Sequence, residues 1–320
     1  MTPSSAYENL DRLITVELRP KSLPQGYVPA FYAAARGTGD PLLYRIATEI
    51  GRLEAGRIAI FAGVYVPPHL AVGEMDGPIG AIVLAGVLED IGHEPQIIVE
   101  TSQVEAVQGL CAIAERSQIL VADLETVAAS GVANYAETLT AAIAIEKLAA
   151  NEDGIRHSLL GTRLDAMEDR TDEVFNELAR RGRLTIGIGD GGNEIGFGAL
   201  DGDVRRILGA TAECRCGCAS GIVAATATKL LLPCAISNVG TYALTAALAL
   251  RLERPELAPR PDLVRALLEG ALDAGFLDGG TLDPTFVGDD GVPGAAISAL
   301  VELQSTIVQQ QSREVAKRPF

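Results

Sequence analysis

The sequence predicts an α/β protein with a mainly parallel, Rossmann-like sheet and helices on both of its faces. Two observations support this fold class. Short apolar runs, rich in β-branched residues, alternate along the chain with longer helix-compatible stretches, as in successive βαβ units. Runs such as IAIFAGV and LTIGIG are apolar almost throughout, which is typical of strands buried on both faces of a parallel sheet.

The expected elements follow in order. Residues 1–55 read as helices with Pro and Gly breaks, and we expect this segment to pack on the rest. Strands are expected over residues 57–64, 95–100, 118–123, 139–146, 184–189 and 230–237. Helices are expected over residues 77–91, 104–116, 242–251 and 293–311. No stretch has the composition of a linker, so we expect residues 1–320 to form a single α/β domain.

The charge of the chain limits its partners. The 320 residues carry a net charge of −16, and the basic residues are scattered. A nucleic-acid partner is therefore not expected, because its phosphates call for a basic patch. An acidic surface also repels an anionic substrate, unless a metal ion or a local Arg or Lys reverses the field at the site.

The location predicted from the sequence is the cytoplasm. Residues 1–23 lack the basic and apolar regions of a secretory signal. The longest apolar runs, over residues 221–227 and 230–236, are separated by Lys229 and are shorter than the ~20 residues that span a bilayer. No membrane contact is expected. The alanine-rich helix over residues 242–251 either packs inside the chain or takes part in a homo-oligomer.

The five cysteines are an odd number, which fits reduced thiols in a cytoplasmic protein. Cys214, Cys216 and Cys218 alternate along the chain, so an extended backbone would place their thiols on one face. A zinc site would need a fourth ligand and usually shows Cys-x-x-Cys spacing. We therefore favour free buried thiols over a structural zinc site.

Acidic and amide side chains recur where the expected strands end, which is where open parallel sheets bind ligands. They are Glu74, Asp76, Asp123, Glu146, Asp190, Asn193, Glu194 and Asn238. Converging carboxylates repel one another unless their pKa values rise or a hard cation binds among them. Mg²⁺ or Mn²⁺ is the natural inference. Asp76, Asn193 and Asp290 also suit helix capping, and that alternative stays open for each.

Residues 187–192 satisfy G-x-G-x-x-G after an expected strand, and Glu213 stands where a dinucleotide site would have its acid. However, Asp190 and Glu194 would set two carboxylates against the phosphates. We favour a loop that presents these two acids and Asn193 to a metal ion or a substrate. A nucleotide-dependent enzyme and a purely structural turn remain alternatives.

Templates for nucleophilic catalysis are missing from the sequence. It contains no G-x-S-x-G elbow. The three histidines have no metal-ligand spacing. Of these, His157 is expected to line the site, and His69 and His93 are expected in loops.

Several motifs carry a family resemblance. GIGDGGNEIGFG and, later in the chain, SNVGTYAL resemble the D-glutamate cyclase family, whose members carry GDGGNEIGMG and SNWGGYAL. EMDGPIGA, IAIEK and the D-G-x-x-H segment that ends at His157 agree with the family in the same order. The resemblance covers residues 57–252, and the glycine-acid motif is its specific part.

The resemblance implies a hydro-lyase that converts D-glutamate, a small amino-acid substrate, to 5-oxo-D-proline and water. A divalent ion, Mn²⁺ or Mg²⁺, would polarise the γ-carboxylate. The expected metal ligands are Glu74, Asp76, Asp190 and Glu194, and the expected catalytic residues are Glu146, Asp190 and Glu194. The expected substrate-binding residues are Asp76, Gly77, Lys147, Gly191, Gly192, Asn193 and Asn238.

Two departures from the family bear on the substrate. Lys147 and the residues after it replace a Pro-Gly turn and a nearby arginine, and a lysine lacks the guanidinium fork that grips a carboxylate. Val239 stands in place of a tryptophan. A related amino acid, a lactam hydrolysed in the reverse direction, and a metabolite-binding protein without turnover therefore remain alternatives.

Overall fold

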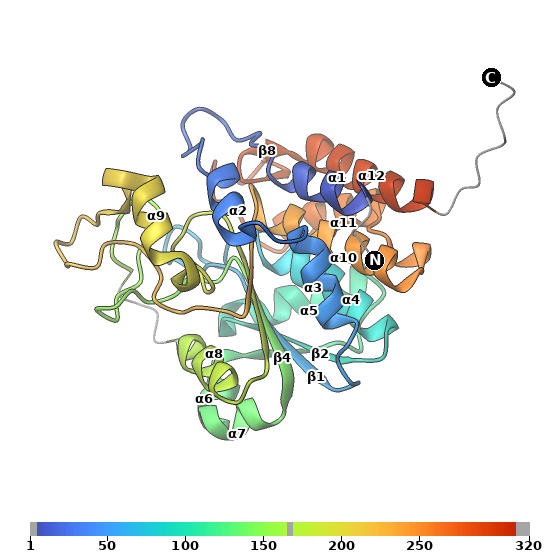
Figure 1. Cartoon of the computed structure of the whole chain (residues 1–320), viewed down its shortest axis with the longest axis horizontal. Coiled ribbons are helices and arrows are strands. Elements are labelled where there is room, and N and C mark those ends of the chain that lie inside the picture. The colour runs from blue at the N-terminus through green and yellow to red at the C-terminus, as the bar shows by residue number, and fades with distance from the viewer. Residues whose placement is uncertain (1–4, 165–168, 312–320) are drawn as a thin grey trace, which may run out of the picture.

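A central sheet of six parallel strands organises the protein, whose computed structural model describes residues 5–164 and 169–311 (Figure 1). The strands are β1 (Arg57–Ala62), β2 (Glu94–Val99), β3 (Leu120–Asp123), β4 (Leu139–Ile145), β5 (Leu184–Gly189) and β6 (Leu230–Pro233). Their order in the sheet is β3-β2-β1-β4-β5-β6, with parallel pairing throughout. This is the Rossmann order, in which ligands bind where the order reverses beside the first strand.

Helices cover both faces of the sheet (Figure 1). The helices on one face are α1 (Ser5–Ile14), α3 (Leu42–Ile50), α4 (Pro78–Asp90), α5 (Val104–Ile113), α10 (Ser237–Leu252), α11 (Pro261–Asp273) and α12 (Gly294–Gln311). Those on the other face are α2 (Val28–Arg36), α6 (Leu124–Ser130), α7 (Val132–Glu137), α8 (Thr171–Arg180) and α9 (Asp201–Leu208). Short 3-10 turns are η1 (Thr101–Gln103), η2 (Gly198–Leu200), η3 (Gly209–Ala212) and η4 (Pro255–Leu257). The predicted fold class is confirmed.

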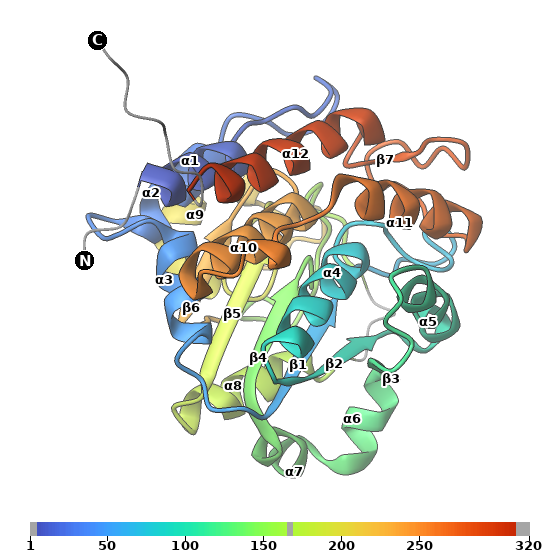
Figure 2. The same ribbon diagram turned by 90° about the vertical axis from the view of Figure 1, so that its right-hand side faces the viewer.

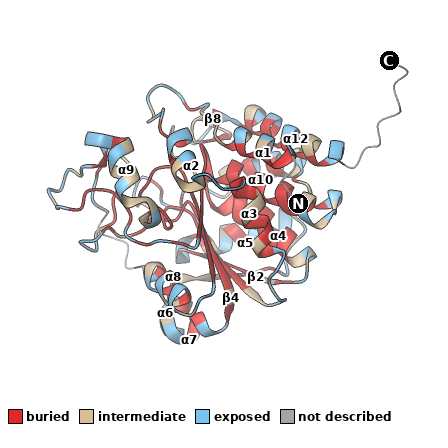
Figure 3. Cartoon of the chain, in the orientation of Figure 1, coloured by how far each residue is buried: buried red, intermediate tan, exposed pale blue. Residues whose placement is uncertain are grey.

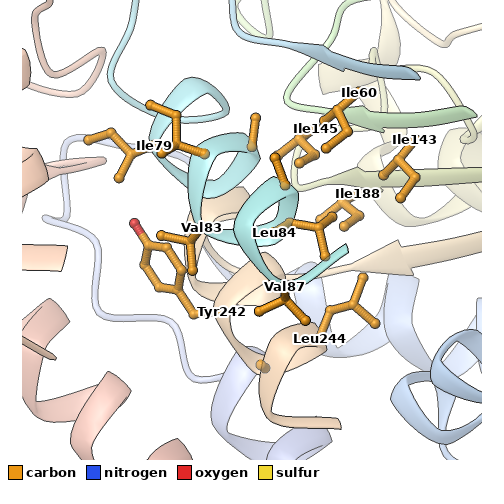
Figure 4. Packing of buried hydrophobic residues seen from close by; sticks show 14 of the residues in the cluster. Ile60, Ile79, Val83, Leu84, Val87, Ile143, Ile145, Ile188, Tyr242 and Leu244 are labelled. Atoms are coloured by element: carbon orange, nitrogen blue, oxygen red, sulfur yellow. The ribbon is translucent and has the colours of Figure 1, made fainter. Parts of the chain in front are cut away.

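The larger core lies between the sheet and the pair α4 and α10, which run side by side over it (Figure 2). Figure 4 shows Leu84 of α4 beside Ile143 and Ile188 of the strands, and Val83 of α4 beside Tyr242 of α10. Helix α10 is buried along nearly its whole length and also contacts α3 and α12. The alanine-rich helix therefore packs inside the chain.

The strands are buried on both sides, as Figure 3 shows. Every residue of β5 is buried, and along β1 Ile58 and Ile60 face one core while Ala59 and Phe61 face the other. Residues of α1 and α3 belong to the same core as the sheet, so we propose that the N-terminal helices and the sheet form one domain. Among the described helices, none has the length and apolar character needed to cross a membrane.

Some expected element ends were wrong. β1 stops at Ala62, because Gly63 turns the chain with a φ of 82°. Ser237 was expected in a strand, but it opens α10, and its backbone N–H donates to Asp76 instead of to a neighbouring strand. The hairpin of β7 (Gly288–Asp289) and β8 (Val292–Pro293) was not expected.

Candidate functional site

A cavity of about 460 Å³ lies at the carboxyl ends of β1, β4 and β5, the position at which Rossmann sheets bind their ligands. Its polar lining residues are Arg19, Ser22, His69, Glu74, Glu146, Ser158, Thr162, Asp190, Asn193 and Asp290. Apolar side chains of residues 159–164 form one wall of the cavity. The cavity therefore combines an acidic floor with a partly apolar cover.

Three carboxylates from separate parts of the chain converge beside this cavity. Asp76 precedes α4, Glu146 follows β4, and Asp190 follows β5. One oxygen from each lies within 4.8 Å of the others. The three residues are only 1%, 9% and 6% exposed. An all-oxygen group of this kind fits a hard divalent cation.

Asp76 holds the N-terminus of α10. Its carboxylate accepts the backbone N–H of Ser237 at 2.9 Å and that of Asn238 at 2.6 Å. Burial, followed by the nearby charge of Asp290, raises the pKa of Asp76 to about 8, although these backbone hydrogen bonds act in the opposite direction. Asp76 is therefore a helix cap, as the capping alternative expected, but the helix is α10, far away in the sequence.

Asn238, expected to bind substrate, is fully buried and bonded within the protein. Its Oδ1 accepts the backbone N–H groups of Gly77 at 3.0 Å and Gly80 at 2.6 Å. Its Nδ2 donates to the Met75 carbonyl and to Asp289. The backbone N–H of Gly77, also expected to contact substrate, is therefore already engaged. Both residues join the two helix N-termini that border the site.

The Glu146 carboxylate accepts a side-chain hydroxyl, whereas the Asp76 carboxylate accepts backbone N–H groups. The backbone of Glu146 is left-handed, with a φ of 48°, and its Oε2 accepts the Ser237 hydroxyl at 2.6 Å. Burial raises the pKa of Glu146 well above its ordinary range, and the charges of Glu194 and Asp76 add to this shift. A carboxyl group that readily keeps a proton is suited to general acid–base work.

Glu194 closes the glycine-rich loop on itself. Its Oε1 accepts the backbone N–H groups of Asp190 at 3.0 Å and Gly191 at 2.7 Å, and its Oε2 accepts that of Gly192 at 2.8 Å. These amides are the ones that a pyrophosphate would need, so the structure disfavours the nucleotide alternative. Glu194 lies outside the three-carboxylate group, and its metal role stays a prediction.

Arg19, which was not among the expected site residues, supplies a positive charge to the cavity. It lies between α1 and α2, is 7% exposed, and pairs with Asp190 and, at 2.7 Å, with Asp290. Its NH2 group also donates to the Ala235 carbonyl at 2.6 Å. Burial opposes the charge, but Asp290 and the other acids raise the pKa of Arg19. No local motif marks this residue.

Asp290 enters the site from the β7–β8 turn. Its φ is 52°, and Asp278 supports the turn by accepting the backbone N–H of Gly291 at 2.9 Å. Glu74, an expected metal ligand, lines the same cavity but is not in the three-carboxylate group. Burial, followed by the charges of Asp290 and Asp76, raises the pKa of Glu74 well above its ordinary range.

Lys147, expected to bind substrate, lies outside the residues that line the cavity. Its Nζ bonds Glu100 at 3.0 Å and Asp169 at 2.8 Å, and its side chain is 1% exposed. Burial works against the charge, but these two acids raise the pKa of Lys147. Lys147, Glu100 and Asp169 therefore form a largely buried ion-pair cluster.

Asn193 connects the cavity to a neighbouring loop. It lines the cavity, and its Nδ2 donates to the carbonyl oxygen of His157 at 2.9 Å. The His157 ring lies beside Cys216, and His69, expected to be a plain loop residue, lines the cavity. Cys214 and Cys218 are half-buried and Cys216 is exposed, so the expected burial of these thiols was wrong.

A wider hollow of about 600 Å³ lies between α7 and α8. Its charged side chains pair with one another, as Arg170 does with Glu173 and Arg180 with Glu177. Three of these four side chains are about half exposed or more, and ion pairs near the surface contribute little to stability. The acidic cavity is therefore the better candidate site.

Comparison with known proteins identifies one family. A family model described as D-glutamate cyclase-like, C-terminal, matches residues 35–300. No curated protein matches the chain. The matched region contains all three converging carboxylates, whereas Arg19 precedes it.

Proposed function

The chain belongs to the D-glutamate cyclase-like family, and from this we propose that it is a lyase that converts D-glutamate to 5-oxo-D-proline and water. The observation that carries the proposal is the group formed by Asp76, Glu146 and Asp190, with oxygens within 4.8 Å of one another. It borders a cavity that also contains Arg19. An ammonium group and two carboxylates on one small substrate match this mixture of charges.

The reaction joins two ends of the same molecule. The α-amine attacks the γ-carboxyl carbon, so a C–N bond forms and a C–O bond breaks. The ammonium group loses one proton before the attack and a second proton as the amide forms, and the leaving oxygen gains these two protons to depart as water. Holding the two ends together supplies much of the rate, because the attack is intramolecular.

Glu146 is our candidate for the proton acceptor. Three backbone N–H groups bind Asp76, and Arg19 binds Asp190, whereas the Oε2 atom of Glu146 accepts the rotatable hydroxyl of Ser237. The other oxygen of Glu146 can take the ammonium proton and return it to the leaving oxygen. Ser237 would keep the carboxyl group oriented meanwhile.

Asp76 and Asp190 are our candidates to hold a divalent ion, Mn²⁺ or Mg²⁺, with Glu74 beside them. Oxygen donors suit these ions, and Arg19 offsets only part of the negative charge of the group. When bound, such an ion supplies Lewis-acid polarisation of the γ-carboxylate. Arg19 would attract the second carboxylate, and Glu194 would hold the loop that carries Asp190.

The remaining expected contacts stay proposals. Asn193 lines the cavity and can offer its amide oxygen to the substrate ammonium. The backbone groups of Gly191 and Gly192 are bonded to Glu194, so we propose that these residues shape the floor. Lys147 and Asn238 would act on substrate only through the residues they position.

The direct test incubates the purified chain with D-glutamate or L-glutamate and Mn²⁺, Mg²⁺ or EDTA, and follows 5-oxoproline by chiral chromatography. We expect metal-dependent product from the D-isomer. Glu146→Gln should lower kcat about 10²-fold or more, whereas Glu125→Gln, at an exposed position on α6, should not. Ligand-induced stabilisation with no product in either direction would instead support a binding protein.

A further inference from the structure

One histidine and three cysteines form a cluster on two loops outside the acidic group. His157 lies on the connection between β4 and α8, and Cys214, Cys216 and Cys218 lie on the connection between α9 and β6. Their ligand atoms all lie within 4.8 Å of one another. The function proposed above uses none of these four side chains.

The distances within the cluster suit a metal centre better than a disulfide. Cys214 Sγ lies 3.2 Å from Cys216 Sγ and 3.3 Å from Cys218 Sγ. The His157 Nε2 atom lies 3.2 Å from Cys216 Sγ and 3.9 Å from Cys218 Sγ. Tetrahedral zinc with Zn–S bonds of about 2.3 Å separates its ligand atoms by about 3.8 Å, whereas disulfide sulfurs are about 2.05 Å apart.

We propose that His157, Cys214, Cys216 and Cys218 bind one structural zinc ion. Three thiolates and an imidazole are soft and borderline donors, which select zinc over Mg²⁺ or Mn²⁺. Four protein ligands close the coordination sphere, so the ion has no open position for a substrate. The fourth ligand that the cysteine spacing lacked comes from a loop elsewhere in the sequence.

Hydrogen bonds outside the cluster hold the two loops in register. Asn151 Nδ2 donates to the Gly221 carbonyl at 2.7 Å, and Asp153 accepts the backbone N–H of Ser220 at 3.2 Å. On the other side, the backbone N–H of Arg215 donates to the Gly161 carbonyl at 2.9 Å. These contacts place the ligands on both sides of the site before any metal binds, as supporting residues do in metal centres.

The zinc would also hold one wall of the acidic cavity. The carbonyl of His157 accepts Asn193 Nδ2 at 2.9 Å, and the next residues, Ser158 and Leu159, line the cavity with Thr162. Loss of the ion would release this wall. Its function is therefore to position cavity residues, with no part in the reaction itself.

The test measures metal in the full chain purified without chelators from zinc-supplemented medium. We expect elemental mass spectrometry to find one zinc ion per chain. A mercurial reagent that blocks thiols should release this zinc. Cobalt(II) should replace it and give the visible bands of a tetrahedral thiolate site. Cys216→Ser, at an exposed position, and His157→Gln should lower zinc retention about tenfold or more.

Two control variants show whether the zinc is bound at this cluster. Cys111→Ala, in a buried cysteine on α5 outside the cluster, and Asp190→Asn, in the acidic group, should both keep the zinc. Limited proteolysis within residues 151–164 should become about tenfold faster in the zinc-free chain, because local opening exposes that loop. The proposal would be overturned if the folded chain contained no zinc and gave no cobalt spectrum. It would also be overturned if the zinc were lost in Asp190→Asn and kept in the variants of the cluster. A disulfide among the three cysteines in the freshly purified chain would overturn it as well.

Discussion

Asp76 and Asn238 cap each other's helices. The backbone N–H of Asn238, in the first turn of α10, donates to Asp76 at 2.6 Å, while Asn238 Oδ1 accepts the N–H of Gly77, next to Asp76, at 3.0 Å. The two helices follow β1 and β6, with β4 and β5 between these strands in the sheet. The exchange satisfies helix N–H groups that would otherwise be buried without partners. It also brings Asp76 to the carboxyl end of β4.

Asn238→Ala tests this exchange. The change removes the acceptor of the Gly80 N–H group and one of the two acceptors of the Gly77 N–H group, and it leaves the Asp289 carboxylate without its amide donor. We expect the free energy of unfolding to fall by roughly 3 kcal/mol, measured by urea denaturation. Asn134→Ala, at an exposed site on α7, should change it by less than about 0.5 kcal/mol. Equal effects of the two changes would refute the capping role.

Gly77→Ala tests the close approach of the loops. Gly77 has a φ of 100°, and a Cβ atom there would lie 2.6 Å from the Gly63 nitrogen. We expect a loss of roughly 3 kcal/mol or more in unfolding free energy. Gly92→Ala is the matched control, because Gly92 has a φ of 95° and nothing within 4 Å of its Cβ position. It should lose only about 1 kcal/mol, and a similar loss at both sites would argue against steric contact at Gly77.

Arg19→Gln should separate metal binding from substrate binding. Removing the cation leaves Asp190 and Asp290 without their ion pair, so the cavity becomes more negative. We expect Mn²⁺ to bind several-fold more tightly and D-glutamate about tenfold more weakly, both by calorimetric titration. Weaker binding of both ligands would mean that Arg19 acts mainly by holding the Asp190 loop in place.

Lys147→Met tests the buried ion-pair cluster. The change leaves Glu100 and Asp169 without their shared cation, and breaking a buried pair costs roughly 3–5 kcal/mol. We expect the urea concentration at the unfolding midpoint to fall sharply. The folded Lys147→Met protein should keep its affinity for D-glutamate. A stable variant with weakened D-glutamate affinity would restore the substrate-binding role expected for Lys147.

Asp11→Asn tests a pH effect remote from the cavity. Asp11 accepts the backbone N–H of Leu42 at 2.8 Å and the hydroxyl of Tyr32, with Arg36 as a more distant charge. Burial raises the pKa of Asp11 from 3.8 to about 6. The folded state therefore binds more protons than the unfolded state between these values, and the contribution of Asp11 to stability falls as pH rises through this window.

Relative to the wild-type chain, Asp11→Asn should thus become more stable by roughly 2–3 kcal/mol as pH rises from about 4 to about 7. Urea denaturation of both chains at each pH measures the difference, and other titrating groups cancel in it. A difference that is flat across the window would show that the folded and unfolded pKa values of Asp11 are alike.

Much of the fold could be predicted from local sequence. The strand over residues 184–189 was predicted with its observed ends, because a continuous apolar run bounded by charged residues has few other structures available. The alternation of strands and helices indicated the parallel sheet. The acids after the strands indicated the edge of the sheet at which Asp76, Glu146 and Asp190 converge, because the carboxyl ends of parallel strands meet there.

Other parts of the site depended on tertiary structure alone. Arg19 reaches Asp190 across 171 positions of the chain, as the two residue numbers give, and no periodicity records such a pairing. The same holds for His157, which joins cysteines that have no metal spacing among themselves. Local patterns also could not tell whether Asn238 would face a ligand or a second helix.

The sequence by itself therefore determined the strand and helix segments, the burial of the sheet and the acidic character of its carboxyl edge, because these depend on neighbouring residues. The tertiary structure decided which acids meet, which cation lies among them and which of them hold helices together. The physical reason is that hydrogen bonds and ion pairs depend on positions in space. The order β3-β2-β1-β4-β5-β6 and the packing of α4 against α10 set those positions.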